Sequence, residues 1–191
     1  MINIAIFASG SGTNAQRIIE YFSGHDDVRV ALVLSNKKDA VVLARAQKLK
    51  VPVHVFSRKN FYESHQVLDV LKDTRIDFII LAGFLWLVPE YLLEAFSNRI
   101  VNIHPALLPA YGGKGMYGMN VHRAVIEAGE KESGITIHLV DEKYDHGKIL
   151  YQARCRIDRN ETPESLAQKI HQLEYTHYPV IIDRFIHSQV Q

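Results

Sequence analysis

The chain has 191 residues, enough for one domain with a full hydrophobic core and short for two independent ones, so we expect a single domain over residues 1–191. Its 22 basic and 21 acidic residues give a formal net charge of +1, which provides no broad positive surface for a nucleic-acid partner. No apolar run reaches the roughly 18 residues of a membrane span, and the single cysteine, Cys155, excludes an internal disulfide and indicates a reducing, cytoplasmic location.

Apolar runs alternate with amphipathic stretches, which predicts strands alternating with helices. In chain order we expect strands at 2–8, 28–34, 53–56, 78–82, 100–103, 135–140 and 149–157. The expected helices are 14–22, 40–49, 61–71, 120–128 and a closing helix capped by Thr162 with Pro163 at its first position. Continuous apolar strands are typical of an α/β fold, an open, mainly parallel twisted sheet with helices on both faces.

A small polar loop, Ala8–Asn14, joins the first strand to the first helix, where backbone N–H groups and the helix dipole favour an anion. The spacing of Gly10, Gly12 and Ala15 also matches the dinucleotide pattern. However, Ser35–Lys38 stands where an acidic ribose ligand is expected, which argues against NAD. Three interpretations stay open: a monophosphate site, an NADP-type dinucleotide site and a plain structural turn.

The strand at 100–103 leads into Asn102-Ile103-His104-Pro105. Residues two apart on a strand share a face, so Asn102 and His104 are predicted to project together. Pro105 ends the strand, which places both side chains near a carboxyl end, where sites gather in open parallel sheets. An amide donor beside an imidazole can stabilise the oxyanion of an acyl transfer. The alternative is a hydrogen-bonded core pair.

Asn102-Ile103-His104-Pro105, followed by Leu107-Leu108-Pro109 and later by Asp145, strongly resembles the folate-dependent formyltransferases. The loop at 9–14 and the segment Leu81–Phe84 narrow this likeness, over nearly the whole chain, to members that formylate glycinamide ribonucleotide (GAR). The resemblance implies a Rossmann-like formyltransferase fold, with a phosphate-binding half at 1–100 and a catalytic and folate-binding half at 101–191.

The implied reaction transfers a formyl group from 10-formyltetrahydrofolate, the co-substrate, to the amine of GAR. It gives formyl-GAR and tetrahydrofolate in de novo purine biosynthesis. The residues show no metal-ligand spacing, so we expect no metal, and we expect a monomer or homodimer. The formyltransferase family also has a cis bond matching Leu108–Pro109. No serine or cysteine is arranged as a nucleophile, so we expect direct attack by the amine.

The resemblance implies that Asn102, His104 and Asp145 are catalytic. The residues alone do not separate Asp145 from Asp141, and a surface turn would explain either. The family's aspartate lies seven residues after a histidine that matches His138 and is followed closely by glycine, as Asp145 is. This spacing favours Asp145.

The resemblance also implies that Gly12, Thr13 and Asn14 bind the GAR phosphate and that Glu174 meets its glycinamide end. The implied folate-binding residues are Phe84, Leu85, Trp86, Leu87, Val88, Asn102, Val140, Asp141 and Asp145. Glu174 alone would also fit a surface helix, and Leu85, Leu87 and Val88 would fit a core. Trp86 replaces an arginine common in relatives, so only backbone contacts carry over there. Lys114, in a glycine-rich loop, has an open role.

Other enzymes share the trio: formyltetrahydrofolate hydrolase, methionyl-tRNA formyltransferase and sugar-nucleotide formyltransferases. Because the first two usually carry an accessory domain, we expect the single-domain GAR enzyme. An NADP oxidoreductase and a silent nucleotide-binding module are the alternatives from other classes. Five scattered histidines show no zinc-ligand spacing: His54, His122, His138, His171 and His177. His122 opens a helix near the glycine-rich loop, where it either supports the site or is structural.

Overall fold

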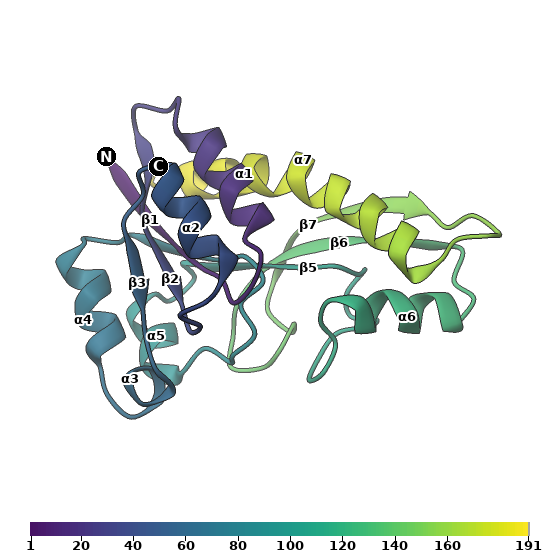
Figure 1. Ribbon diagram of the computed structural model, residues 1–191, viewed down its shortest axis with the longest axis horizontal. Coiled ribbons are helices and arrows are strands. Elements are labelled where there is room, and N and C mark those ends of the chain that lie inside the picture. Colours follow the sequence, from purple (N-terminus) through teal and green to yellow (C-terminus); the bar gives the residue numbers. More distant parts are fainter. Residues whose placement is uncertain (191) are drawn as a thin grey trace. The chain divides into compact units, whose positions relative to one another are not determined.

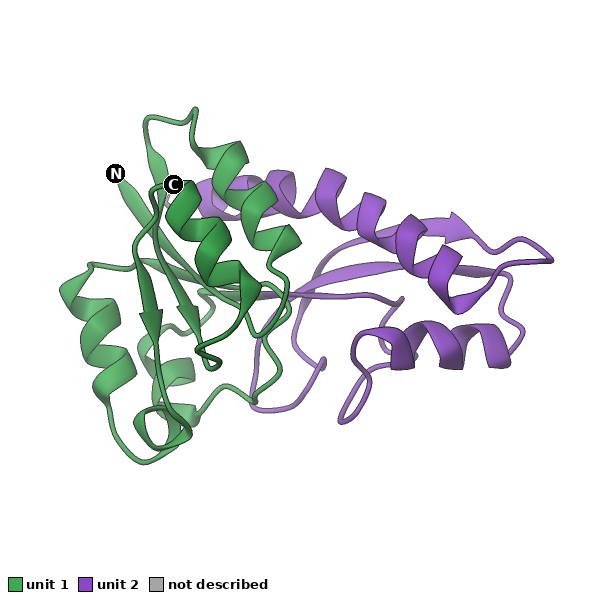
Figure 2. Cartoon of the chain, viewed as in Figure 1, with its two compact units in different colours: residues 1–101 green, residues 102–191 purple. Residues whose placement is uncertain are grey.

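The computed structural model describes residues 1–190. It divides into two compact units, Met1–Val101 and Asn102–Gln191, coloured green and purple in Figure 2. The unit boundary falls inside strand β5 (Ile100–His104). The strand order of the seven-stranded sheet is β3-β2-β1-β4-β5-β6-β7.

In the first unit, β1 (Ile2–Phe7) pairs in parallel with β2 (Val28–Ser35) and β4 (Phe78–Leu81), and β2 pairs in parallel with β3 (Val53–Val55). The helices α1 (Thr13–Phe22) and α2 (Val41–Lys48) join β1, β2 and β3 (Figure 1). From β3 the chain returns to β4 on the other side of β1. Right-handed crossovers therefore put α1 and α2 on one face of the sheet and the return connection on the other.

The return connection differs from the single helix predicted at 61–71. It contains α3 (Arg58–Tyr62) and α4 (Gln66–Asp73), with α5 (Glu90–Ala95) after β4. Ser57 and Asn60 form a capping box that starts α3 earlier than expected, and the hydroxyl of Ser64 donates to the Asn60 carbonyl at 3.2 Å where α3 ends. The six-residue α5 was not predicted because it is too short to show a periodic pattern.

In the second unit, β6 (Glu132–Leu139) and β7 (Ile149–Arg156) pair antiparallel, with Ile135 opposite Ala153. The long α7 (Pro163–Val190) packs on both strands and on α6 (Met119–Glu127). The prediction of an open α/β sheet that is mainly parallel is confirmed, and β6 and β7 are paired antiparallel within it.

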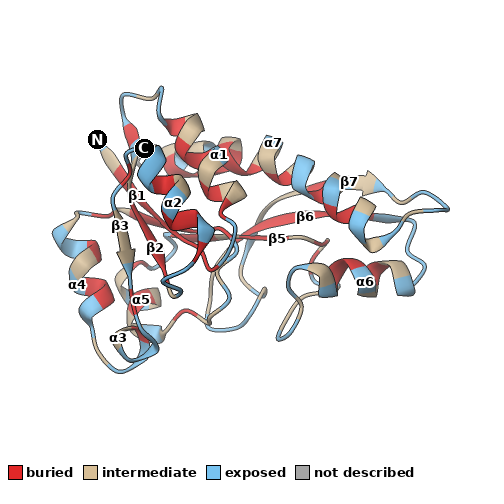
Figure 3. Cartoon of the chain, viewed as in Figure 1, coloured by how far each residue is buried: buried red, intermediate tan, exposed pale blue. Residues whose placement is uncertain are grey.

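The burial pattern explains the continuous apolar strands. Ile4, Ala5, Ile6 and Phe7 on β1 are all almost fully buried, although alternate residues point to opposite faces of the sheet (Figure 3). This strand is therefore covered on both sides, as in parallel sheets generally. No helix within residues 1–190 is long and apolar enough to cross a membrane.

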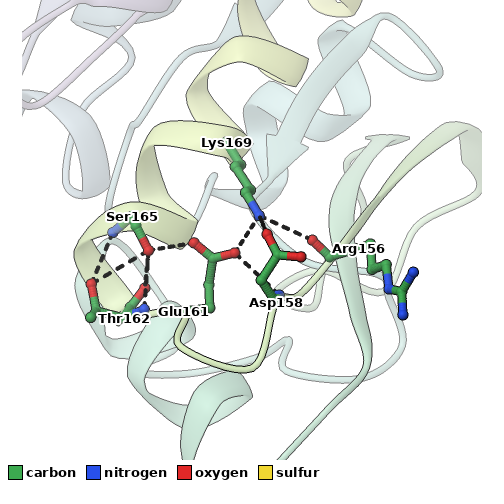
Figure 4. Close-up of polar contacts among 6 residues, drawn as sticks. All are labelled: Arg156, Asp158, Glu161, Thr162, Ser165 and Lys169. Atoms are coloured by element: carbon green, nitrogen blue, oxygen red, sulfur yellow. Dashed lines mark hydrogen bonds and ion pairs between the residues drawn. The ribbon is translucent and has the colours of Figure 1, made fainter.

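Polar contacts fix the start of α7 (Figure 4). The Thr162 hydroxyl accepts from the Ser165 backbone N–H at 3.2 Å, so the predicted cap is confirmed, with Pro163 as the first helical residue. The Lys169 ammonium pairs with Asp158, 2.7 Å away, and with Glu161. These pairs tie the loop before the helix to its second turn.

Candidate active site

The strand β5 presents two polar residues at its carboxyl end. Asn102 is half-buried and His104 is 3% exposed, so the imidazole is almost removed from solvent. The Leu108–Pro109 peptide bond shortly after the strand is cis, as the resemblance implied.

Both ring nitrogens of His104 have defined neighbours. Nε2 lies 2.7 Å from the Tyr111 carbonyl oxygen, and because a carbonyl can only accept, Nε2 carries a hydrogen. Nδ1 lies 3.4 Å from Oδ2 of Asp145. Nδ1 is therefore the nitrogen that gains or loses a proton, and it faces a carboxylate.

His138, on β6, orients the amide of Asn102. Its Nδ1 lies 2.8 Å from the Leu139 carbonyl and so carries a hydrogen. An amide nitrogen can only donate, so Nε2 accepts from the Asn102 amide nitrogen, 3.1 Å away. One amide hydrogen is thereby used, and the second can donate to a substrate oxygen. The same Nε2 lies 3.7 Å from Oδ1 of Asp145.

The structure brings Asp145, rather than Asp141, next to His104. The Asp145 side chain is 10% exposed, and its Oδ2 accepts from the Gly113 N–H at 3.0 Å. Asp141 instead accepts from the Lys143 backbone N–H at 2.9 Å, and its Oδ2 lies 3.1 Å from Nδ1 of His146. The two aspartates therefore differ in where their carboxylates point: Asp145 faces His104, and Asp141 faces His146. Sequence spacing alone does not show this.

Burial and charge act in opposite directions on this pair. Burial lowers the pKa of His104 below its ordinary value, although the Asp145 charge and the Tyr111 carbonyl raise it. Burial raises the pKa of Asp145, but contacts with His138, His104 and Gly113 outweigh it and the net direction is down. The net direction of both pKa values is therefore downward, by burial at His104 and by its hydrogen-bonding and charged neighbours at Asp145.

Two residues that the sequence analysis missed hold the segment after His104. The Thr136 hydroxyl accepts from the Leu108 N–H at 2.9 Å and donates to the Ala106 carbonyl at 2.7 Å. The Gln152 amide donates to the Leu108 carbonyl at 3.0 Å and to the Thr136 hydroxyl at 2.9 Å. Isolated polar residues on β6 and β7 carry no local motif, so no sequence signal pointed to them.

The residues predicted to bind the GAR phosphate lie in the first unit. Gly12 is the N-cap residue of α1, with φ of 74°, and a Cβ built there would lie 2.4 Å from the Val42 side chain, so only glycine fits. Thr13 and Asn14 follow in the first turn. Ser9, Gly10 and Ser11 of this loop, together with residues 36–41, line a pocket of about 600 Å³.

The predicted folate segment 84–88 has mixed surroundings in the first unit. Phe84 and Trp86 join an aromatic cluster around Phe61, with ring centroids 5.5 and 5.8 Å from it. Leu85 is 40% exposed, whereas Val88 is buried. The Leu87 carbonyl accepts from the Tyr62 hydroxyl at 2.9 Å. The alternative interpretation, that these apolar residues belong to the core, is therefore right for Val88 and wrong for Leu85.

The remaining predicted residues lie in the second unit. Val140 and Asp141 follow β6 and are half-buried. Glu174, on α7, is only 7% exposed, so the alternative of a surface helix position is wrong. Burial and the Glu174 charge both raise the pKa of Tyr178. Within residues 1–190, no group of three or more His, Cys, Asp or Glu could hold a metal ion.

Comparison with known proteins gives consistent similarities. Residues 2–182 match the formyl transferase family. Chloroplastic phosphoribosylglycinamide formyltransferase of Arabidopsis thaliana is 42% identical, covering 98% of this chain and 66% of the plant protein. The Haemophilus influenzae phosphoribosylglycinamide formyltransferase is 37% identical, covering 100% and 90%. The crystal structure of the same enzyme from Bacillus halodurans has a TM-score of 0.86 at 39% identity, covering 96% of this chain and 95% of that one.

Proposed function

The chain belongs to the formyl transferase family, and on that premise we propose that it transfers a formyl group from 10-formyltetrahydrofolate to the amine of GAR. The products are formyl-GAR and tetrahydrofolate, and the reaction belongs to purine biosynthesis. The observation that carries this function is the convergence of Asn102, His104 and Asp145, with Nδ1 of His104 3.4 Å from Asp145.

In the proposed first step, the GAR amine attacks the formyl carbon directly. A new C–N bond forms while the formyl oxygen becomes an oxyanion. The Asn102 amide supports that charge through the N–H that it does not give to His138. A preorganised donor of this kind is worth about 100 to 1,000-fold in turnover.

The proton lost by the amine then moves to the bare Nδ1 of His104, directly or through water. The Asp145 carboxylate stabilises the resulting imidazolium, because the two opposite charges are only 3.4 Å apart. The imidazolium therefore forms during the reaction and is not the resting form. When the bond from the formyl carbon to N10 of the folate breaks, the same proton passes to N10, and tetrahydrofolate leaves.

The substrate-binding residues are part of this proposal. Gly12, Thr13 and Asn14 hold the GAR phosphate at the start of α1, where backbone N–H groups favour an anion. Glu174 meets the glycinamide end. Residues 84–88 and 140–145, with Asn102, hold the folate mainly through backbone groups.

The cellular setting is part of the same proposal. A single, half-buried cysteine, Cys155, suits a reducing compartment, so we assign the chain to the cytoplasm as a monomer or homodimer. It acts on two small molecules, with no nucleic-acid or membrane partner.

One assay tests the function. The protein is incubated with 10-formyltetrahydrofolate and GAR, and tetrahydrofolate release is followed spectroscopically. Release that requires GAR supports the proposal. Release without GAR would indicate a hydrolase. No release of tetrahydrofolate, with or without GAR, would overturn formyl transfer.

A further inference from the structure

A three-residue turn, Tyr111–Gly113, contacts both members of the histidine–aspartate pair. The Tyr111 carbonyl accepts from Nε2 of His104 at 2.7 Å, and the Gly113 N–H donates to Oδ2 of Asp145 at 3.0 Å. Both contacts come from the backbone of the turn. The position of the turn therefore sets the orientation of the imidazole and of the carboxylate together.

The backbone of this turn is in an uncommon conformation. Tyr111 has φ of 57° and Gly113 has φ of 95°, both in the left-handed region that bulky residues rarely adopt. At Gly112, an added Cβ would lie 2.5 Å from the Leu108 side chain and 3.2 Å from Cβ of Asp145. A turn of this kind persists only where surrounding contacts hold it.

The side chain of Tyr111 supplies such a contact. Its hydroxyl donates to Oε1 of Glu130 at 2.7 Å, and this hydrogen bond, with burial and the Glu130 charge, raises the pKa of Tyr111. Glu130 is itself tied to the end of α6, because its N–H lies 3.4 Å from the Val125 carbonyl. The hydroxyl thus connects the turn to a helix.

We propose that Tyr111 and Glu130 are a positioning pair for His104: their hydrogen bond holds the Tyr111 carbonyl where it keeps the proton on Nε2 and turns Nδ1 toward Asp145. Only the predicted effect on kcat rests on the proposed function; the predicted effect on the pKa of His104 does not. Neither side chain reaches the reacting atoms in this role, and both act through the backbone of the turn.

Loss of the pair has a defined direction of effect on His104. The groups that act on its ring are Asp145, His138, the Tyr111 carbonyl and, on α6, His122. The carbonyl bonds more strongly to an imidazolium than to an imidazole, so a displaced turn lowers the pKa of His104. Because the imidazolium must form during the reaction, the rate falls as well.

The experiment compares Tyr111→Phe, Glu130→Ala and the double variant with two matched controls. Tyr117→Phe removes a hydroxyl from an exposed tyrosine six residues away, and Glu127→Ala removes an exposed carboxylate from α6. We expect kcat to fall about 3 to 10-fold in each single variant with KM for both substrates within about twofold, which is the effect of losing one hydrogen bond. The kcat of the double variant should equal that of either single variant, because each substitution removes the same Tyr111–Glu130 hydrogen bond.

Two readouts separate positioning from general destabilisation. NMR titration of the His104 ring should show a lower pKa in Tyr111→Phe and Glu130→Ala, and Glu130→Gln, which keeps an acceptor oxygen, should restore the native titration. An unchanged His104 titration in the folded variants, fully multiplicative effects in the double variant, or a change in KM alone would overturn the proposal. The titration needs no substrate, so it tests the pair even if the GAR assay fails.

Discussion

The imidazole of His104 turns Nδ1, and not Nε2, toward the carboxylate of Asp145, with 3.4 Å between Nδ1 and Oδ2. Since the Tyr111 carbonyl fixes a hydrogen on Nε2, the negative charge acts on the one nitrogen that titrates. Burial lowers the pKa of His104 and so makes it a weaker base, and the charge of Asp145 offsets part of that decrease.

Replacing Asp145 by asparagine should therefore lower the pKa of His104 further, because the charge that raises it is removed. The imidazolium becomes harder to form, so kcat should fall about 100-fold or more. NMR titration of His104 and the kinetic constants check the two effects separately. A His104 pKa that stays the same or rises in the folded variant would contradict this role of Asp145.

Asn102→Ala should lose about 100 to 1,000-fold in turnover while still binding both substrates, because it removes an oxyanion donor. Stopped-flow turnover and calorimetric binding of each substrate measure the two quantities. Asn160→Ala, in an exposed loop, is the control and should keep native activity. If Asn102→Ala loses affinity for a substrate but keeps its turnover, Asn102 binds the substrate and does not stabilise the oxyanion.

His104→Ala should lose about 100 to 10,000-fold in turnover, the usual worth of a proton-transfer group. The measurement is formyl transfer at saturating concentrations of both substrates. Near-native turnover would show that proton transfer runs through another group.

Gly12→Val should weaken GAR binding at least about tenfold and leave folate binding near native, because the new side chain would meet Val42 and disturb the first turn of α1. Calorimetric Kd values for the two substrates test this. Gly24→Ala, outside this loop, is the control, since a Cβ there would have nothing within 4 Å. Native GAR affinity in Gly12→Val would refute the phosphate assignment.

His122→Leu should flatten the dependence of stability on pH. Burial lowers the pKa of His122 from 6.5 to about 4, and its Nδ1 has no hydrogen-bond partner within residues 1–190. Its folded pKa is depressed, so the unfolded chain binds more protons between about pH 6.5 and 4, and stability falls as pH falls through that window. At pH 5 the loss is on the order of 2 kcal/mol relative to pH 8.

Urea unfolding of native protein and His122→Leu at pH 8 and pH 5 measures that difference. If the free energy of unfolding declines equally in both proteins, His122 is protonated in the folded chain and its burial has no such effect. Comparing the two proteins cancels the contributions of the other histidines.

Patterns within a few consecutive residues predicted most helices and strands, but they did not predict hydrogen bonds between polar residues that are far apart in the sequence. The strand bearing Asn102 and His104 was predicted because periodicity and Pro105 are encoded within a few residues. Asp145 was preferred to Asp141 only through the family resemblance, because the residues alone do not show which carboxylate faces His104. Thr136 and Gln152 are single polar residues whose partners lie up to 44 positions away. The break between α3 and α4 depends on side-chain contacts at Ser57 and Ser64, which periodicity does not register.

The two compact units divide the proposed tasks unevenly. The phosphate loop at Gly12–Asn14 lies in Met1–Val101, whereas Asn102, His104 and Asp145 all lie in Asn102–Gln191. Substitutions that alter the grip on an acceptor's phosphate can therefore accumulate without touching the groups that move protons. Under this proposal, the phosphate end of the formyl acceptor can be varied independently of the chemical step, whereas its amine end stays tied to the second unit through Glu174.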